Sequence, residues 1–389
     1  TSRCQSVPES MNHKDTGNSG NRNNSLSGVS TPKQNHVFNT PRLLWTLKAG
    51  ESHRLTTGLE LVNEQLHFDM NPLGYDDLKS MNTGSLYVQD EIRSQKALSF
   101  TAGVRADWNN RFGWHVTPKV SVKYSVGKFT IRGNYANGYR NPTLKELFME
   151  FKVPTQGETY IMGNDALKPE TNHYLSLAGE FTTQDFNISA TLYNSYFRNK
   201  IDVRGHMEGL KTLLQYENIR RSQMGGIELI ARWRICRGLF LRGNYNYLFQ
   251  IDDASQESTQ YIYPSPHTAT LQADYGFSAG NNCYINFNAT LRYVGAKTYE
   301  DFMPIIDLSG MSSGSMADLK YWTGSYSARQ EGYVICDAAI NFDFKEMVGI
   351  SVGVDNIGNY RPKIVNFNSA TTPRRNMFIR VSYAFATKK

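Results

Sequence analysis

The stretch from Cys283 to Val294, "CYINFNATLRYV", alternates between apolar and polar residues. Its apolar members fall on one side of an extended chain and its Asn, Thr and Arg residues fall on the other, because side chains of a strand point alternately to opposite faces. The same alternation recurs along most of the chain and predicts about 15 strands. No helical periodicity of comparable length competes with it, so the pattern predicts an all-β protein.

The connections between these strands alternate in length. Short turns are predicted at "AGESH", "RSQKA", "SVGK", "TTQD", "ICRG", "SAGNN" and "FKEM". Between them lie longer polar or irregular segments, at residues 68–82, 109–114, 139–170, 202–214, 251–266, 298–329 and 358–375. Outer-membrane barrels have short turns at one rim and longer loops at the other. The alternation therefore favours an antiparallel transmembrane β-barrel over a soluble sandwich.

The two faces of each predicted strand support the same choice. In a soluble fold every apolar face would need a covering layer, and the polar faces could not pack against one another without water. In a membrane barrel, lipid covers the apolar faces and the polar faces line a wet interior. We therefore expect Arg242, Asp274 and Arg292 to point inward. No run of 18 or more apolar residues occurs, so the sequence predicts no helical membrane span.

Composition excludes several functions. The net charge is +7, but the basic residues form no block of five or more, so nucleic acid is not an expected partner. The four cysteines lack CxxC or zinc-like spacing and are expected to be isolated thiols. No signal-peptide pattern is visible at the N-terminus. Because GxSxG, HExxH and a phosphate-binding glycine loop are absent, we expect no enzyme.

Several strings appear in the order found in TonB-dependent outer-membrane receptors, and the chain resembles that family from Thr83 onward. They include "GYRNPTLKELF", "LKPE", "QYENIRRSQMGGIEL" and "VGVDNIGNYRP". The resemblance implies about the last 15 strands of a 22-stranded barrel in the outer membrane of a Gram-negative bacterium. The plug domain and the TonB box would lie outside this chain. Residues 37–389 are the expected barrel, and residues 1–36, rich in Asn, Ser and Gly, are expected to be an external loop or disordered.

The resemblance implies active import of a scarce ligand captured at external loops, with energy supplied by the TonB-ExbB-ExbD complex. The pair "YRNP" and "NDALKPE" resembles two boxes that bracket a loop in haem-uptake receptors, although the usual histidine between them is missing here. We therefore expect haem or another iron chelate as ligand, without a covalent cofactor. Within the family, cobalamin and siderophores also fit. The sequence leaves open a passive porin-like barrel, an outer-membrane phospholipase, and a truncated or split gene product.

Membrane lipids, lipopolysaccharide and a surface lipoprotein complete the expected partners. The candidate ligand-binding residues lie near predicted external loops, and the metal ligands are left unknown. They are Tyr139, Arg140, Tyr160, Met162, His173, His206, Met207, Trp114 and Trp322. Tyr160 and Met162 could bind haem iron in place of histidine.

Each candidate also has a structural interpretation. The two boxes could simply pack strand ends and loops, and the histidines could be solvated. Trp114 and Trp322 could belong to an aromatic girdle at the lipid headgroups rather than stack on a ligand. Residues 143–151, "TLKELFMEF", predict a short amphipathic helix whose Lys145, Glu146 and Glu150 form a solvated face.

Overall fold

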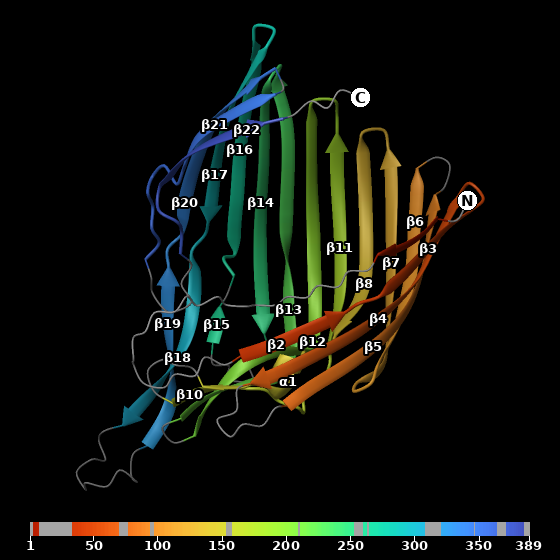
Figure 1. The fold of residues 1–389 in the computed structure, drawn as a ribbon, viewed down its shortest axis with the longest axis vertical. Coiled ribbons are helices and arrows are strands. Elements are labelled where there is room, and N and C mark those ends of the chain that lie inside the picture. The colour runs from red at the N-terminus through yellow and green to blue at the C-terminus, as the bar shows by residue number, and fades with distance from the viewer. Residues whose placement is uncertain are drawn as a thin grey trace.

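The computed structural model describes residues 3–7, 33–69, 77–93, 97–152, 158–208, 211–252, 260–262, 264–307, 320–345, 347–363 and 371–384. Nearly all of them lie in strands, and the one helix among them, α1, spans Leu144–Phe148. Figure 1 shows most of the described strands standing side by side in one broad sheet of 19 strands, and three further strands form a separate small sheet. No helix within these residues is long and apolar enough to cross a membrane.

Fifteen strands, which we call the wall, follow one another as an antiparallel meander in which each strand pairs with the next. This number agrees with the prediction from alternation. The strands are β3 (Arg42–Ala49), β4 (His53–Asp69), β5 (Asp77–Arg93), β6 (Leu98–Asn109), β7 (Gly113–Val126), β8 (Phe129–Arg140), β11 (Glu170–Thr182), β12 (Phe186–Glu208), β13 (Lys211–Cys236), β14 (Leu239–Asp252), β16 (His267–Ala279), β17 (Cys283–Val294), β20 (Tyr333–Phe344), β21 (Val348–Asp355) and β22 (Asn376–Tyr383).

Seven further strands lie outside the meander. They are β1 (Arg3–Val7), β2 (Lys33–Asn39), β9 (Glu150–Lys152), β10 (Glu158–Met162), β15 (Gln260–Ile262), β18 (Lys297–Asp307) and β19 (Lys320–Gln330). β1 pairs with β3, and β2 pairs with β4, so residues 3–7 and 33–36 of the segment 1–36 belong to the sheet. The rest of that segment, residues 1–2 and 8–32, lies outside the described residues.

The predicted short turns lie together at one rim, at the top of Figure 1. Several contain a glycine in the left-handed region, including Gly50, Gly127, Gly238 and Gly280. At Gly238, with φ of +89°, a Cβ atom would also clash with the carbonyl oxygen of Gly276. A residue with a side chain would strain this turn, because only glycine adopts such backbone angles freely. These residues explain how the strands reverse so tightly at this rim.

The two faces of the wall differ as the sequence predicts. On one face the large apolar side chains are exposed, for example Leu61, Leu177 and Leu192 with 61%, 54% and 53% of their surface accessible. On the other face polar side chains bond across strands. Asn288 Nδ2 donates to Asp274 Oδ1 at 2.6 Å, and Arg292 Nη2 donates to Asp337 Oδ2 at 2.5 Å. Burial of apolar side chains between elements is therefore not what holds the wall together.

At the opposite rim, several long connections are paired hairpin arms rather than irregular loops. The predicted loop 202–214 is wrong in this respect, because β12 and β13 run on to Glu208 and from Lys211 and pair along their length. β18 and β19 likewise pair with each other, residues 297–307 with residues 320–330, where the sequence predicted the loop 298–329. The two strands of each arm form backbone hydrogen bonds with each other, so these arms can extend beyond the wall.

The connection between β8 and β11 folds onto these arms. β10 pairs antiparallel with β9 and parallel with residues 211–215 of β13. We call residues 141–169 together with the arms 198–208 and 211–221 the rim subdomain. It lies at the bottom of Figure 1, where α1 and β10 are labelled.

The buried apolar clusters lie in and beside the rim subdomain, not in the middle of the wall. One cluster joins Leu144 of α1 to Leu66 and Met81 of the β4–β5 hairpin. The other joins Leu147 of α1 to Leu167 and Ile201. Leu144 and Leu147 expose only 1% and 2% of their surface. Helix α1 is therefore the element around which this rim is packed.

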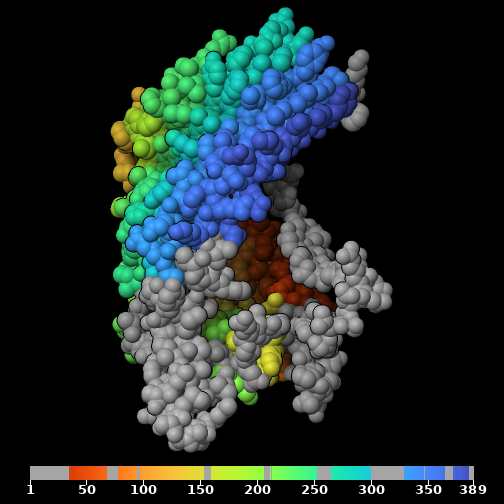
Figure 2. All heavy atoms as spheres, turned by 90° about the vertical axis from the view of Figure 1, so that its left-hand side faces the viewer, coloured from red at the N-terminus to blue at the C-terminus, as the bar shows by residue number. Residues whose placement is uncertain are grey.

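The wall is strongly curved and open at its edges. Seen from the side, the red N-terminal strands lie behind a gap below the blue C-terminal strands (Figure 2). Within the described residues β22 pairs only with β21, and it makes no pairing with β1 or β3. The fifteen strands thus form part of a barrel wall.

Candidate functional site

Arg140, one of the predicted ligand contacts, ties the rim subdomain to the end of β8. Its Nη1 atom donates to both carboxylate oxygens of Glu146, at 3.0 and 2.8 Å. Its Nη2 atom reaches Glu170 Oε2 at 3.4 Å, and the same oxygen accepts from the backbone N–H of Ile201 at 2.9 Å. One guanidinium thus joins both motifs, "YRNP" and "LKPE", to the β12 arm.

Glu146 also closes the N-terminus of α1. Thr143 is the N-cap: its Oγ1 accepts from Glu146 N at 3.2 Å, and its own N–H donates to Glu146 Oε2 at 2.7 Å. This reciprocal arrangement is a capping box, which satisfies two helix-end donors. The helix prediction is confirmed, but the expectation that Glu146 lies on a solvated face is wrong, because its side chain is only 15% exposed.

A third motif holds the returning chain. In "QYENIRR", the Asn218 side chain donates to Lys168 O at 2.9 Å and accepts from Lys168 N at 2.8 Å. Asn164 donates to Tyr216 O at 3.0 Å. Backbone contacts are also close: a Cβ atom added at Gly163 would lie 2.6 Å from the carbonyl carbon of Leu147. Three of the strings that carry the family resemblance therefore bond to one another here.

Tyr139 precedes Arg140 at the end of β8 and therefore belongs to the wall. Its ring stacks on His115 with centroids 4.3 Å apart and planes 3° apart. Nearby, Arg105 donates to Asp107 Oδ1 at 2.8 Å and to Glu60 Oε1 at 3.0 Å. These charges are largely neutralised among themselves. Tyr139 is therefore a packing contact between β7 and β8 in this structure, and its role toward a ligand stays a prediction.

Tyr160 is the predicted residue that lies in the most suggestive surroundings. The Lys152 and Lys211 ammonium groups lie 5.5 and 5.9 Å from the centre of its ring. The lysines belong to β9 and β13, the strands on either side of β10. Both lysines are exposed, so positive charge and an aromatic face are presented together at this rim. An anion with a flat or aromatic part is the kind of ligand that such a surface attracts.

Met162, His206 and Met207 lie near Tyr160 in the sheet. Met162 is two residues beyond Tyr160 on β10, so both side chains project from the same face of that strand. The backbone of Leu213 pairs with both Tyr160 and His206, so these two lie in one row of the sheet. Met207 pairs with Thr212 in the adjacent row. The structure thus brings Tyr160, Met162 and the His206 position together.

The remaining candidates lie elsewhere. His173 accepts or donates through Nδ1 to the Tyr135 hydroxyl at 2.9 Å, on the wall. Trp114, 71% exposed, pairs in register with Trp108 near the turn at 110–112. This cross-strand pair continues the exposed apolar face, which is the position of a girdle residue. Trp322 lies in β19 opposite Ile305, and its side chain is outside the described residues.

Sequence reasoning missed several residues. Lys152 and Lys211 carry no local signal, because they meet at Tyr160 only through the long-range pairing of β10. Asn356 in "VGVDNIGNYRP" was also missed: only 4% exposed, it donates to Tyr360 O and Pro373 O and has a φ of +50°. Asparagine in a left-handed turn position was the signal that could have marked it.

Metal binding by the described side chains is not indicated, since no group of three His, Cys, Asp or Glu residues in these ranges could hold an ion. Among the cysteines whose side chains the structure describes, Cys236, Cys283 and Cys336 are free thiols.

Comparison with known proteins identifies the family. The description "TonB dependent receptor-like, beta-barrel" matches residues 5–357, and the chain belongs to this family. Its barrel fold is therefore that of the outer membrane of Gram-negative bacteria, with the apolar face of the wall toward lipid and the polar face toward the interior.

Individual relatives are more distant. The ferric enterobactin receptor of Pseudomonas aeruginosa is 22% identical over 71% of this chain and 37% of its own length. The ferric enterobactin receptor PirA of the same organism is 24% identical over 53% of this chain and 30% of its own length. A solved structure of PfeA from P. aeruginosa, a ferric enterobactin receptor with enterobactin bound, has a TM-score of 0.70 at 19% identity and covers 92% of this chain and 55% of that one.

The chain spans about a third of the length of these curated relatives and about half of the solved receptor. The structural likeness supports the fold. These curated relatives are named as ferric enterobactin receptors, and they do not confirm the haem-receptor subgroup expected from the sequence.

Proposed function

We propose that this chain is the barrel portion of a receptor that imports a ferric siderophore across the outer membrane. The observation that carries the proposal is its membership of the receptor-barrel family together with curated relatives named as ferric enterobactin receptors. Energy would come from the TonB-ExbB-ExbD complex, as the family resemblance implies. No covalent cofactor takes part, and the iron complex is the cargo.

The rim subdomain supplies the surface that first meets the ligand in this proposal. Lys152, Tyr160 and Lys211 present two positive charges around one aromatic ring, on strands fixed by the buried side of the same subdomain. Arg140 and Glu146 would act indirectly, since each already binds the other and holds α1. The family motifs of the sequence would then build the scaffold, while the lysines and Tyr160 make the contacts.

The test is a fluorescence-quenching titration of the purified full-length receptor with ferric enterobactin and, in parallel, with haem. We expect ferric enterobactin to saturate at one equivalent. Changing Lys152→Gln and Lys211→Gln together should weaken binding by about tenfold or more, because two contacts to charged groups are lost. Trp114→Phe, on the lipid-facing side, serves as the matched control and should bind as the parent does. Saturable haem binding without enterobactin binding would contradict the proposal.

Haem remains a second candidate on one specific observation: Tyr160 and His206 lie in one row of the sheet, and Met162 projects from the same face of β10 as Tyr160. Tyrosine, methionine and histidine are all known haem-iron ligands. The haem titration tests this second candidate when the absorbance of the Soret band is recorded as well. A shift of the Soret band that is lost in Tyr160→Phe or His206→Ala would support haem as the ligand. An unshifted band would exclude haem.

A further inference from the structure

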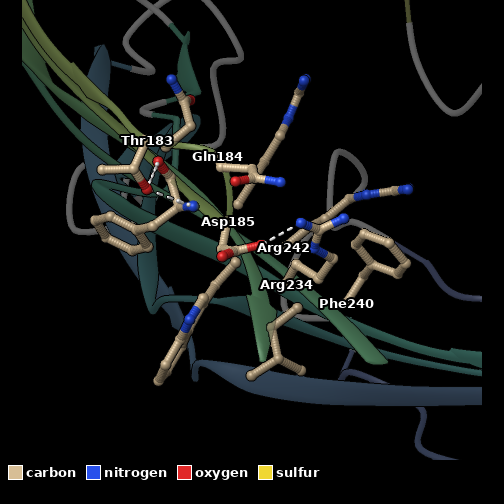
Figure 3. Close-up of a pocket in the computed structure, with 11 residues that line it drawn as sticks. Thr183, Gln184, Asp185, Arg234, Phe240 and Arg242 are labelled. Carbon is tan, nitrogen blue, oxygen red and sulfur yellow. Dashed lines mark hydrogen bonds and ion pairs between the residues drawn. The ribbon is translucent and has the colours of Figure 1, made fainter. Parts of the chain in front are cut away.

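The opposite rim, at the tight turns, carries a cluster of arginines that the import proposal does not use. A hollow of about 420 Å³ opens between the turn 183–185 and the ends of β13 and β14. Its lining includes Arg232, Arg234 and Arg242, and Figure 3 shows several of these residues with Asp185.

Two of these arginines stand directly opposite each other. Arg232 of β13 and Arg242 of β14 are partners in the antiparallel register. They share the polar face, because Arg242 is within 3.8 Å of Asp274, whose other oxygen bonds Asn288 on that face. Like charges directly opposite on neighbouring strands are destabilising. A pairing of this kind needs a compensating negative charge.

The acidic side chains around the pair are already engaged. Asp185 accepts from Arg234 Nε at 2.6 Å, the ion pair marked in Figure 3. Glu180 lies 2.7 Å from Arg132 and accepts from Asn187 at 2.8 Å. Asp274 Oδ2 lies 3.8 Å from Arg242 Nη1, an ion pair beyond hydrogen-bond distance, so this one carboxylate faces Arg242 while Arg232 stands opposite. Within the described part of the chain, the Arg232 guanidinium forms no ion pair and no side-chain hydrogen bond.

We infer that Arg232 and Arg242 form an oxyanion-binding site on the inner side of the turn rim. A guanidinium presents a planar fork of donors that matches the two oxygens of a carboxylate or phosphate. One such group held between the two arginines would remove their repulsion and give Arg232 a partner. The hollow beside them has room for the rest of the ligand. The oxyanion could be a free phosphate or an acidic side chain of polypeptide that occupies the barrel interior.

The test measures the thermal midpoint of the detergent-purified full-length protein at constant ionic strength, in chloride, in inorganic phosphate and with a hexaglutamate peptide. Both anions are compared with chloride for the parent protein, Arg232→Gln and Arg237→Gln. Arg237 is the matched control, because it is an exposed arginine in the adjacent turn. Arg232→Lys keeps the positive charge but lacks the planar guanidinium group. This conservative variant serves as the alternative if Arg232→Gln does not fold.

Arg232→Gln should raise the thermal midpoint in chloride, but it should abolish the further rise that the anion gives the parent protein. In chloride, Arg232→Gln should raise the midpoint by about 1–3 °C, because one like-charge contact disappears. With the anion, the parent and Arg237→Gln should gain stability by mass action, while Arg232→Gln should gain none. A response to phosphate alone identifies a free anion, and a response to the peptide alone identifies a polypeptide carboxylate. Equal responses in all three proteins, or none, would overturn the site.

Discussion

The wall and the rim subdomain of this protein are stabilised in different ways. Wall strands expose large apolar side chains on one face and polar side chains on the other, and they are joined mainly by backbone ladders. The rim subdomain instead buries Leu144 and Leu147 of α1 against Leu66, Leu167 and Ile201, and an ion pair fixes this helix. The comparison teaches that the apolar core of a barrel protein can lie in its loops.

The same comparison assigns roles to the family motifs. "YRNP", "LKPE" and "QYENIRR" meet in the rim subdomain and bond to one another, and "DNIGNYRP" folds around Asn356 at another connection. They fix how loops leave the wall. This fits our proposal that side chains outside these motifs, such as Lys152 and Lys211, contact the ligand.

The largest expected contrast is between two leucines. Leu147→Ala should lower the opening free energy of the rim subdomain by about 3–5 kcal/mol, because it leaves a cavity in a dry cluster. Leu177→Ala on the wall should change local opening by less than about 1 kcal/mol, since lipid chains are as apolar as leucine and fill the space. Native-state hydrogen exchange at the amides of α1 and β11 measures both. Equal effects would remove the distinction between the two regions.

A pair of adjacent residues tests the faces of the wall. Leu192→Lys should destabilise the barrel by about 2–4 kcal/mol, because it places a charge in lipid near the middle of a spanning strand. Thr191→Lys, on the polar face, should cost less than about 1 kcal/mol, because water in the interior solvates the new charge. Urea unfolding from bilayers gives both values. If the Thr191 variant were the less stable, the assignment of inner and outer faces would be reversed.

Arg140 tests the ion-pair network of the rim subdomain. Arg140→Ala leaves the carboxylates of Glu146 and Glu170, both 15% exposed, without their main partner. We expect a loss of about 2–3 kcal/mol in local stability, below the value for a fully buried pair because Arg140 itself is 41% exposed. The measurement is the rate of thermolysin cleavage within residues 141–169. Lys168→Gln, whose side chain is exposed, is the control and should be cleaved at the parental rate.

The smallest effect concerns Tyr216, in the arm of β13 beyond its pairing with β14. Burial, with the nearby charges of Glu146 and Asp202, raises the pKa of the Tyr216 hydroxyl above its usual 10.0. A raised pKa favours folding below the unfolded pKa, so this contribution is lost as pH rises through about 10 toward the folded pKa. Cleavage of the rim subdomain should accelerate as the pH rises above about 10, while Tyr216→Phe should show a smaller increase over the same range.

Much of the wall could be predicted from the sequence. A strand with lipid on one side and water on the other has a strict period of two, so alternation alone located the fifteen strands and their tight turns. The charged residues Arg242, Asp274 and Arg292 were likewise placed on the inner face by position. Here local pattern and environment agree, which is why a single sequence is sufficient.

The rim subdomain could not be predicted in the same way. The segment 202–214 was expected to be a polar or irregular loop, but its arms are strands because they pair with each other and the β13 arm also pairs with β10. Glu146 was expected in solvent because its partners, Arg140 and Glu170, are brought to it only by the return of the chain. Three-dimensional contacts with no periodic signature decide this region, including the position of Tyr160 between two lysines.

The most direct test of the central claim is native-state hydrogen exchange on the unmodified full-length receptor as denaturant is raised. If the rim subdomain is stabilised by its own core, then α1, β10 and residues 198–221 should exchange through one shared opening of lower free energy. Wall amides in β6, β7, β16 and β17 should then exchange separately and more slowly. A single opening free energy common to both regions would contradict the account.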